Sequence, residues 1–172
     1  RVKQRCQIYI SSTYSDLIEE RQAVIRAILN LGQFPMGTEF FNASNSTTFE
    51  MISKSINESD CVILIIGEKY GSIYDVEGIS FVEAEYNYAL SNNIPVLVFV
   101  KNISKQDIPI NLKKFRERLF SHIVILWNDI GELRIEVSKA LVKFLLDLQQ
   151  NELKENNIHI GNGSHVRISN VS

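Results

Sequence analysis

Hydrophobic residues along the chain alternate between short, nearly unbroken runs and longer segments in which they recur every three or four positions. Runs of the first kind are typical of buried β-strands, and segments of the second kind are typical of helices with one buried face. Five runs are expected to be strands: Cys6–Ile10, Phe34–Phe41, Cys61–Ile66, Pro95–Val100 and His122–Trp127. Helical segments follow each of them, which predicts repeated strand–helix units and therefore a parallel sheet covered on both faces.

The helical segments carry apolar stripes and start signals. The first has the stripe Leu17, Val24, Ile28 and Leu31, and later helices are expected over Phe81–Leu90, Asn111–Phe120 and Gly131–Leu153. A capping box is a Ser, Thr or Asp followed three residues later by Glu at the start of a helix. Three such pairs are interpreted as helix starts: Asp16 with Glu19, Thr47 with Glu50, and Ser80 with Glu83.

Two features of the strands indicate their order. Pro35 cannot donate to a hydrogen-bonded ladder, which favours an edge position for its strand. Cys61–Ile66 shows no alternation, as expected for a central strand that is buried on both faces. We therefore predict a doubly wound, flavodoxin-like α/β sheet in the order 2-1-3-4-5. Its ligand site would lie beyond the carboxyl ends of strands one and three.

Length, charge and cysteine content narrow the class of protein. The 172 residues suit one domain over 1–153, followed by a polar tail over 154–172 that we expect to be a linker or hairpin leading to a further domain. A net charge of -2 provides no basic field for nucleic acid, and no hydrophobic run approaches the ~20 residues of a membrane span. Two cysteines within apolar runs suit a reducing compartment, so a cytoplasmic location without a metal site is expected.

Glu85 is the residue whose predicted position most needs an explanation. Helical spacing places it on the same face as Val82, Tyr86 and Ala89, which must pack toward the sheet. A carboxylate there costs several kcal/mol unless it is paired or functional. Glu85 is therefore either a site residue or half of a buried ion pair, while Glu83 is expected to serve only the helix start.

Other candidates lie in the loops at the predicted ligand edge. The hydroxyl-rich run from Ser11 to Asp16 could cradle a phosphate or ribose, or could be an ordinary polar loop with an N-cap. Arg21 could pair with Glu39, with Glu85 or with a ligand phosphate, or could be a solvated cation. Gly67 and Gly71 would let a ligand approach the backbone. His122 lies at the opposite edge of the sheet, so a Ser-His-Asp triad is not expected.

Several segments together resemble a known family over about Cys6–Lys101. The segments Ile8–Tyr14, Glu39–Ser44, Tyr70–Ser72 and Gly78–Ala89 are similar to the TIR-like domain-of-unknown-function family numbered 4062. This family resembles a branch of the TIR and nucleoside deoxyribosyltransferase superfamily. It is typically the amino-terminal module of larger proteins that carry NTPase and repeat domains.

The resemblance implies roles for individual residues. In TIR NAD hydrolases and deoxyribosyltransferases a glutamate on a helix acts at the ribose C1′, four residues before a small residue, and Glu85 stands in this relation to Ala89. Ser80 stands five rather than the usual six residues before this glutamate. By the resemblance, Glu85 is the catalytic candidate, and the substrate-binding candidates are Ser11, Ser12, Tyr14, Arg21, Glu39, Gly67, Tyr70, Gly71, Ser80 and Tyr88.

Three functions are compatible with these residues. The first is a TIR-like effector that cleaves the N-glycosidic bond of NAD or a related nucleotide, is activated by self-association, and acts in bacterial antiviral defence. The nucleotide would then be a substrate and not a cofactor. The second is a non-catalytic module that binds a nucleotide or associates with its own kind within a larger protein. The third is an enzyme like the nucleoside deoxyribosyltransferases.

Overall fold

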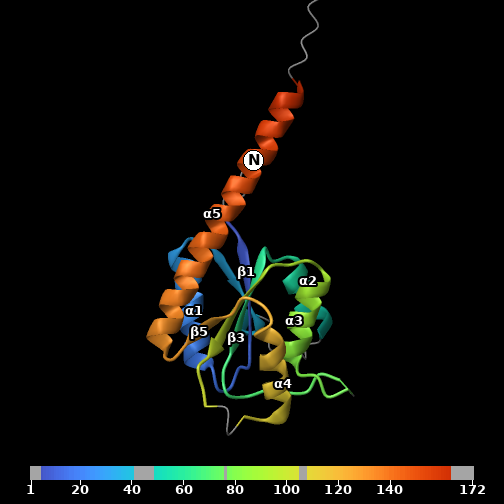
Figure 1. The fold of residues 1–172 in the computed structure, drawn as a ribbon, viewed down its shortest axis with the longest axis vertical. Helices are drawn as coiled ribbons and strands as arrows, with labels where there is room; N and C mark the ends of the chain where they lie inside the picture. Colours follow the sequence, from blue (N-terminus) through green and yellow to red (C-terminus); the bar gives the residue numbers. More distant parts are fainter. Residues whose placement is uncertain (1–4, 41–48, 76, 105–107, 164–172) are drawn as a thin grey trace, which may run out of the picture.

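The chain folds around a five-stranded parallel sheet with helices on both faces (Figure 1). The computed structural model describes residues 5–40, 49–75, 77–104 and 108–163. The strand order is β2-β1-β3-β4-β5, which confirms the doubly wound, flavodoxin-like prediction. The strands are β1 (Gln7–Ser12), β2 (Phe34–Met36), β3 (Cys61–Ile66), β4 (Val96–Lys101) and β5 (Ile125–Trp127).

The helices divide between the two faces of the sheet. They are α1 (Ile18–Asn30), α2 (Phe49–Asn57), α3 (Phe81–Ser91), α4 (Ile110–Leu119) and α5 (Ile130–Gly163), with a short 3-10 helix η1 (Thr38–Phe40). Helices α1 and α5 share one core with the sheet, and α2, α3 and α4 pack on the other face. All four strand pairings are parallel, so the carboxyl ends of the strands meet at one edge.

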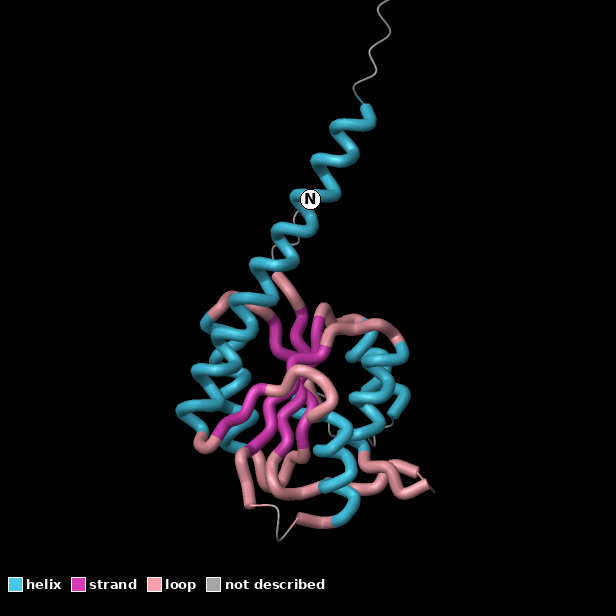
Figure 2. Tube along the Cα trace, viewed as in Figure 1, coloured by secondary structure: helices cyan, strands magenta, loops and turns pink. Residues whose placement is uncertain are grey.

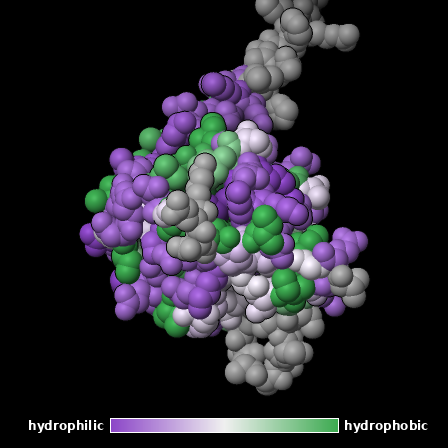
Figure 3. Space-filling model, turned by 60° about the horizontal axis from the view of Figure 1, so that its bottom comes forward, coloured by the Kyte–Doolittle hydropathy of each residue, from purple (hydrophilic) through white to green (hydrophobic). Residues whose placement is uncertain are grey.

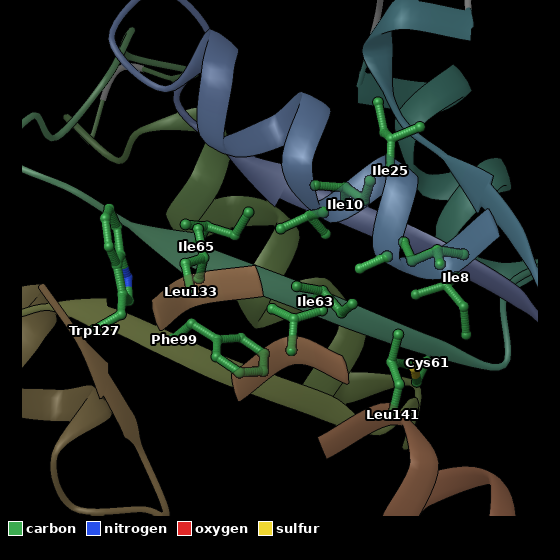
Figure 4. Close-up of a cluster of buried hydrophobic side chains, with 14 of the residues drawn as sticks. Ile8, Ile10, Ile25, Cys61, Ile63, Ile65, Phe99, Trp127, Leu133 and Leu141 are labelled. Atoms are coloured by element: carbon green, nitrogen blue, oxygen red, sulfur yellow. The ribbon is translucent and has the colours of Figure 1, made fainter. Parts of the chain in front are cut away.

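The core follows the alternation of side chains along the central strands. Ile63 and Ile65 of β3 face α1 and α5, while Val62 and Leu64 face the other three helices. Figure 4 shows the core between the sheet and helices α1 and α5, in which Trp127 of β5 lies fully buried. Every residue of β3 is buried, as the unbroken apolar run predicted. Pro35 lies on β2 at the edge of the sheet, which is also confirmed.

Several predicted boundaries and one cap are wrong. Strand β1 continues to Ser12, because pairing with β3 extends through the polar end of the strand. Strand β2 ends at Met36, where the backbone turns into η1. Strand β5 begins only at Ile125, and His122 lies in the turn that closes α4.

Helix α1 has Leu17 as its N-cap without a side-chain hydrogen bond, so Asp16 does not form the expected capping box. Phe41 and Thr47 fall outside the described residues.

Helix α5 is longer than the pattern predicted. It continues from Ile130 to Gly163, beyond the expected end at Leu153, so the first part of the expected linker or hairpin is helical. Figure 2 shows its carboxyl-terminal half extending away from the sheet. Residues 164–172 lie outside the described part of the chain. Among the described helices, including α5, none is apolar over a length that would cross a membrane.

Candidate functional site

A pocket of about 650 Å³ lies at the carboxyl edge of the sheet, where strands β1 and β3 end. The loop between β1 and α1 forms one wall, the loop between β3 and α3 forms another, and α3 contributes the side chains between them. This is the position that the switch between strands one and three predicts. The lining residues are Ser12, Thr13, Tyr14, Ser15, Asp16, Thr38, Ile52, Lys69, Gly71, Ser72, Phe81, Val82 and Glu85.

Glu85 is the buried acid of this pocket. Its side chain enters from the sheet-facing side of α3 and is 4% exposed. Within the described part of the chain, its Oε2 atom has no hydrogen-bond partner and the carboxylate forms no ion pair. Burial raises the pKa of Glu85 from 4.5 to about 7, against the opposing effects of the Ser11 hydroxyl and the Arg21 charge. The sequence left two interpretations open, and among the described residues the buried ion pair is not formed.

Ser11 and Ser12, at the end of β1, have side chains on opposite faces of the sheet. Ser11 is 1% exposed and lies near enough to Glu85 to lower the pKa of its carboxyl group. Ser12 has its side chain on the other face of the strand, where its Oγ accepts a hydrogen bond from Arg21 Nη1 at 2.8 Å. Both serines were predicted as site residues, and the structure places one beside the acid and the other on the pocket lining.

Arg21 and Glu39 form a buried ion pair next to the pocket. Arg21 is 2% exposed and donates from both Nε and Nη2 to the Glu39 carboxylate, with Nη2 at 2.6 Å from Oε2. Its Nη2 also donates to the Ile10 carbonyl at 3.3 Å. The pair lowers the pKa of Glu39, in spite of the opposing effect of burial. Both residues were predicted to bind substrate, but the described pocket lining includes neither.

The loop between β3 and α3 is attached to the start of α3 by Tyr70. The Tyr70 hydroxyl donates to Glu83 and accepts a bond from the Ser80 backbone N–H at 3.2 Å. Ser80 Oγ in turn accepts from the Glu83 N–H at 3.2 Å, so the serine half of the predicted cap is confirmed. Glu83 also pairs with Arg118 of α4 at 3.1 Å. Tyr70 and Ser80 were both predicted to bind substrate. In the structure, their hydrogen bonds attach the loop to the start of α3.

The two pocket loops contact each other at two glycines. A Cβ on Gly67, at the end of β3, would lie 3.0 Å from the Leu17 side chain. A Cβ on Gly71 would lie 2.8 Å from the Thr13 methyl group, and Gly71 has a φ of +89°. Gly71 lines the pocket, while the described pocket lining does not include Gly67. A side chain at either glycine would therefore require its neighbour on the opposite loop to shift.

The two remaining predicted residues are tyrosines with different surroundings. Tyr14 lines the pocket, is 52% exposed, and has its ring 5.8 Å from the Arg21 guanidinium carbon. Tyr88 lies between α2 and α3, where its hydroxyl accepts a hydrogen bond from Asn57 and its ring stands at 6.0 Å from Phe49. The pocket lining contains Phe81 and does not include Tyr88 among the described residues.

Sequence reasoning assigned no ligand role to several residues of the pocket. Asp16 ended the candidate hydroxyl-rich run but was explained as a helix cap, and Lys69 and Ser72 lie in a loop of which only Gly67, Tyr70, Gly71 and Ser80 were named as candidates. Thr38 and Ile52 come from η1 and α2, and no local signal in the sequence connects them with β1. The edge that carries this pocket is turned toward the viewer in Figure 3, where hydrophilic residues surround separate hydrophobic patches. The described residues contain no cluster of three His, Cys, Asp or Glu residues that could hold a metal.

Comparison with known proteins identifies the family and the fold. The family model "Domain of unknown function (DUF4062)" matches residues 7–142. The RPS4 and RRS1 TIR domain heterodimer is 11% identical, covers 81% of this chain and 97% of that chain, and has a TM-score of 0.52. A search of curated proteins found no match.

Two further solved structures align with lower TM-scores. The Clostridium botulinum CMP N-glycosidase BcmB is 12% identical, with 76% of this chain and 97% of that chain covered and a TM-score of 0.48. The diflavin flavoprotein A3 from Nostoc sp. is 13% identical, with 88% and 99% covered and a TM-score of 0.48. At these identities the comparisons concern the fold, which the TIR domains share. Because the family model spans most of the chain, this protein belongs to the DUF4062 family, and its fold is TIR-like.

Proposed function

We propose that this protein cleaves the N-glycosidic bond of NAD or a related nucleotide, with Glu85 as the catalytic residue. The observation that carries the proposal is a buried carboxylate, with one oxygen unpartnered among the described residues, that faces a pocket of about 650 Å³. A buried carboxylate without a partner is destabilising, and such groups are retained where function requires them. The family resemblance assigns the same residue.

The reaction needs little beyond a carboxylate and a shielded sugar. When the bond between C1′ and the nicotinamide nitrogen breaks, its electron pair leaves with the nitrogen and neutralises the positive charge of the ring. The sugar develops oxocarbenium charge, which an ionised Glu85 would stabilise or trap covalently. Water then adds to C1′ and releases a proton, which gives ADP-ribose and nicotinamide.

The lining of the pocket suits a nucleotide. Phe81, Ile52 and Val82 provide an apolar side for a base, while Ser12, Ser15 and Ser72 provide hydroxyls and Lys69 a positive charge for a phosphate. Glu85 follows Phe81 by four residues on α3, so both lie on the same face of that helix. A glycosidic bond between a base near Phe81 and a sugar would therefore lie within reach of the carboxylate.

The test is nicotinamide release from NAD by concentrated protein, with base release from CMP measured in parallel. Glu85→Gln should lower the rate on the order of 100-fold or more, because an amide cannot stabilise the developing charge. Glu77→Gln is the control: Glu77 is an exposed residue outside the described pocket lining, and the variant should retain activity within a few-fold. In the wild-type protein kcat/KM should rise with pH through about 7, as Glu85 ionises. Equal rates in wild type and Glu85→Gln would refute the proposal and leave a nucleotide-binding module.

The biological setting that we propose follows the family resemblance: antiviral defence in bacteria, with activation by self-association. Its support is the resemblance, which places such modules at the amino terminus of larger proteins. NAD cleavage measured over a range of protein concentrations, with sedimentation of the same samples, tests this part. Specific activity should rise with the fraction of protein in the associated state, and activity that is independent of concentration would argue against it.

A further inference from the structure

The loop between β1 and α1 presents two buried polar atoms that have no partner among the described residues. They are Thr13 Oγ1 and Asp16 Oδ1, and both residues line the pocket that contains Glu85. The Thr13 methyl group lies toward Gly71, at 2.8 Å from the position of a Cβ there, so contact with the other wall is made by carbon. The hydroxyl is left without a partner among the residues that the structure describes.

Asp16 is the less expected of the two. An aspartate just before a helix ordinarily accepts a hydrogen bond from a backbone N–H of the first turn. Here the N-cap of α1 is Leu17, and the helix start has no side-chain hydrogen bond. The Asp16 carboxylate is therefore not used to begin the helix, and its Oδ1 is buried beside the pocket. A buried carboxylate oxygen without a donor is unfavourable, so a donor supplied by a ligand in the adjoining pocket would stabilise it.

We propose that Asp16 and Thr13 bind the hydroxyl groups of the ribose whose C1′ faces Glu85, so that the pocket selects ribonucleotides over 2′-deoxyribonucleotides. This inference rests on the proposed function, because it takes Glu85 as the residue at C1′. A carboxylate accepts from two neighbouring hydroxyls at once, as a vicinal diol requires, and the Thr13 hydroxyl can donate or accept.

The other parts of a nucleotide fit these two residues less well. A phosphate would be repelled by the Asp16 carboxylate, and Lys69 offers it a cation elsewhere on the lining. A base fits better beside Phe81, Ile52 and Val82. The sugar hydroxyls are the donors that remain, and they stand next to the carbon on which Glu85 would act.

Binding to matched nucleotide pairs tests the inference. We would measure the Kd of AMP and dAMP, and of CMP and dCMP, by calorimetry with the wild-type protein, Asp16→Ala, Asp16→Asn and Thr13→Ser. The wild-type protein should prefer the ribonucleotide about 10- to 100-fold, as expected for hydrogen bonds to a charged group. Asp16→Ala should abolish the preference, Asp16→Asn should keep part of it, and Thr13→Ser, which retains the hydroxyl, should keep most of it.

The outcomes separate this inference from the proposed function. Equal affinity for both members of each pair, a preference that survives Asp16→Ala, or no binding of any of the four nucleotides would each overturn it. Base release at equal rates from CMP and dCMP would overturn it while leaving the proposed function intact. A ribose preference that depends on Asp16, in a protein that releases no base, would support it and refute the proposed catalysis. Asp16→Ala could lose the preference because it folds incorrectly, so Asp16→Asn, which is nearly isosteric, is the control. Its thermal unfolding would be compared with that of the wild type.

Discussion

Ser11 and Ser12 are adjacent on β1, but their side chains lie on opposite faces of the sheet and serve two different charges. Ser11 lies beside Glu85 of α3, and Ser12 accepts a hydrogen bond from Arg21 of α1 at 2.8 Å. The end of β1 therefore stands between a buried acid and a buried cation. Because Arg21 is already paired with Glu39, its charge only partly offsets the effect of burial on Glu85. This arrangement explains why the pKa of Glu85 remains raised beside an arginine.

Removing one member of the Arg21–Glu39 pair should destabilise the protein more than removing both. Arg21→Met leaves a carboxylate that is 12% exposed without its partner, and we expect a loss of about 3–5 kcal/mol in the free energy of unfolding. Chemical denaturation measures this loss. The double variant Arg21→Met/Glu39→Leu should recover most of it, because the unpaired charge is gone. If the two single substitutions simply add in the double variant, the pair is not coupled and the interpretation is wrong.

The raised pKa of Glu85 gives stability a definite dependence on pH. The folded protein holds the Glu85 proton up to about pH 7, while the unfolded chain releases it near 4.5. The stabilising contribution of the protonated form is therefore complete below pH 4.5 and is lost as the pH rises to about 7. Relative to wild type, Glu85→Gln should gain about 3 kcal/mol over that interval, from 1.36 kcal/mol for each unit of pKa.

Denaturation curves at several pH values, with the exposed Glu77→Gln variant as the baseline, measure this difference. The stabilities of wild type and Glu85→Gln should diverge between pH 4.5 and 7 and then run parallel. Curves that stay parallel throughout would mean that Glu85 ionises normally in the folded protein.

The sequence predicts the sheet well where burial alone determines it. Strand β3 has the predicted bounds, because an unbroken apolar run can be accommodated only between two covered faces. The predictions are less accurate where hydrogen bonding between distant segments determines the end of a strand. Ser11 and Ser12 look like loop residues, yet they continue the ladder with Leu64 and Ile65.

Prediction of the site shows the same division. Glu85 was identified because a carboxylate on an apolar helix face is conspicuous in any sequence. Asp16 ended the candidate hydroxyl-rich run, but its own role was explained by the capping box with Glu19, and only the structure shows that no such cap forms. The pairing of Arg21 with Glu39 was one of several open alternatives, since spacing along the chain cannot determine which charges meet.

Tyr70→Phe tests whether the Tyr70 hydroxyl supports the loop between β3 and α3. The phenylalanine keeps the ring but loses the hydrogen bonds to Glu83 and to the Ser80 N–H. We expect a loss of about 1 kcal/mol in the free energy of unfolding, measured by denaturation. Tyr88→Phe is the matched control, because its hydroxyl bonds to Asn57 at an exposed position, and it should cost less. If Tyr70→Phe is as stable as wild type, the hydroxyl does not support the loop.

Gly71→Ala should disturb the pocket by two separable effects. The φ of +89° strains any residue with a Cβ, and the new methyl group would lie 2.8 Å from Thr13 Cγ2. Gly78→Ala is the control for strain alone, since Gly78 has a φ of +80° and no atom within 4 Å of its Cβ position. We expect Gly71→Ala to cost about 1–3 kcal/mol and Gly78→Ala less, measured by chemical denaturation. Adding Thr13→Ser to Gly71→Ala removes the crowded methyl group. The loss of stability should then fall to about that of Gly78→Ala. Equal losses in the two alanine variants would show that the pocket walls yield at this contact, and that the separation of the two loops is not set by Gly71 and Thr13.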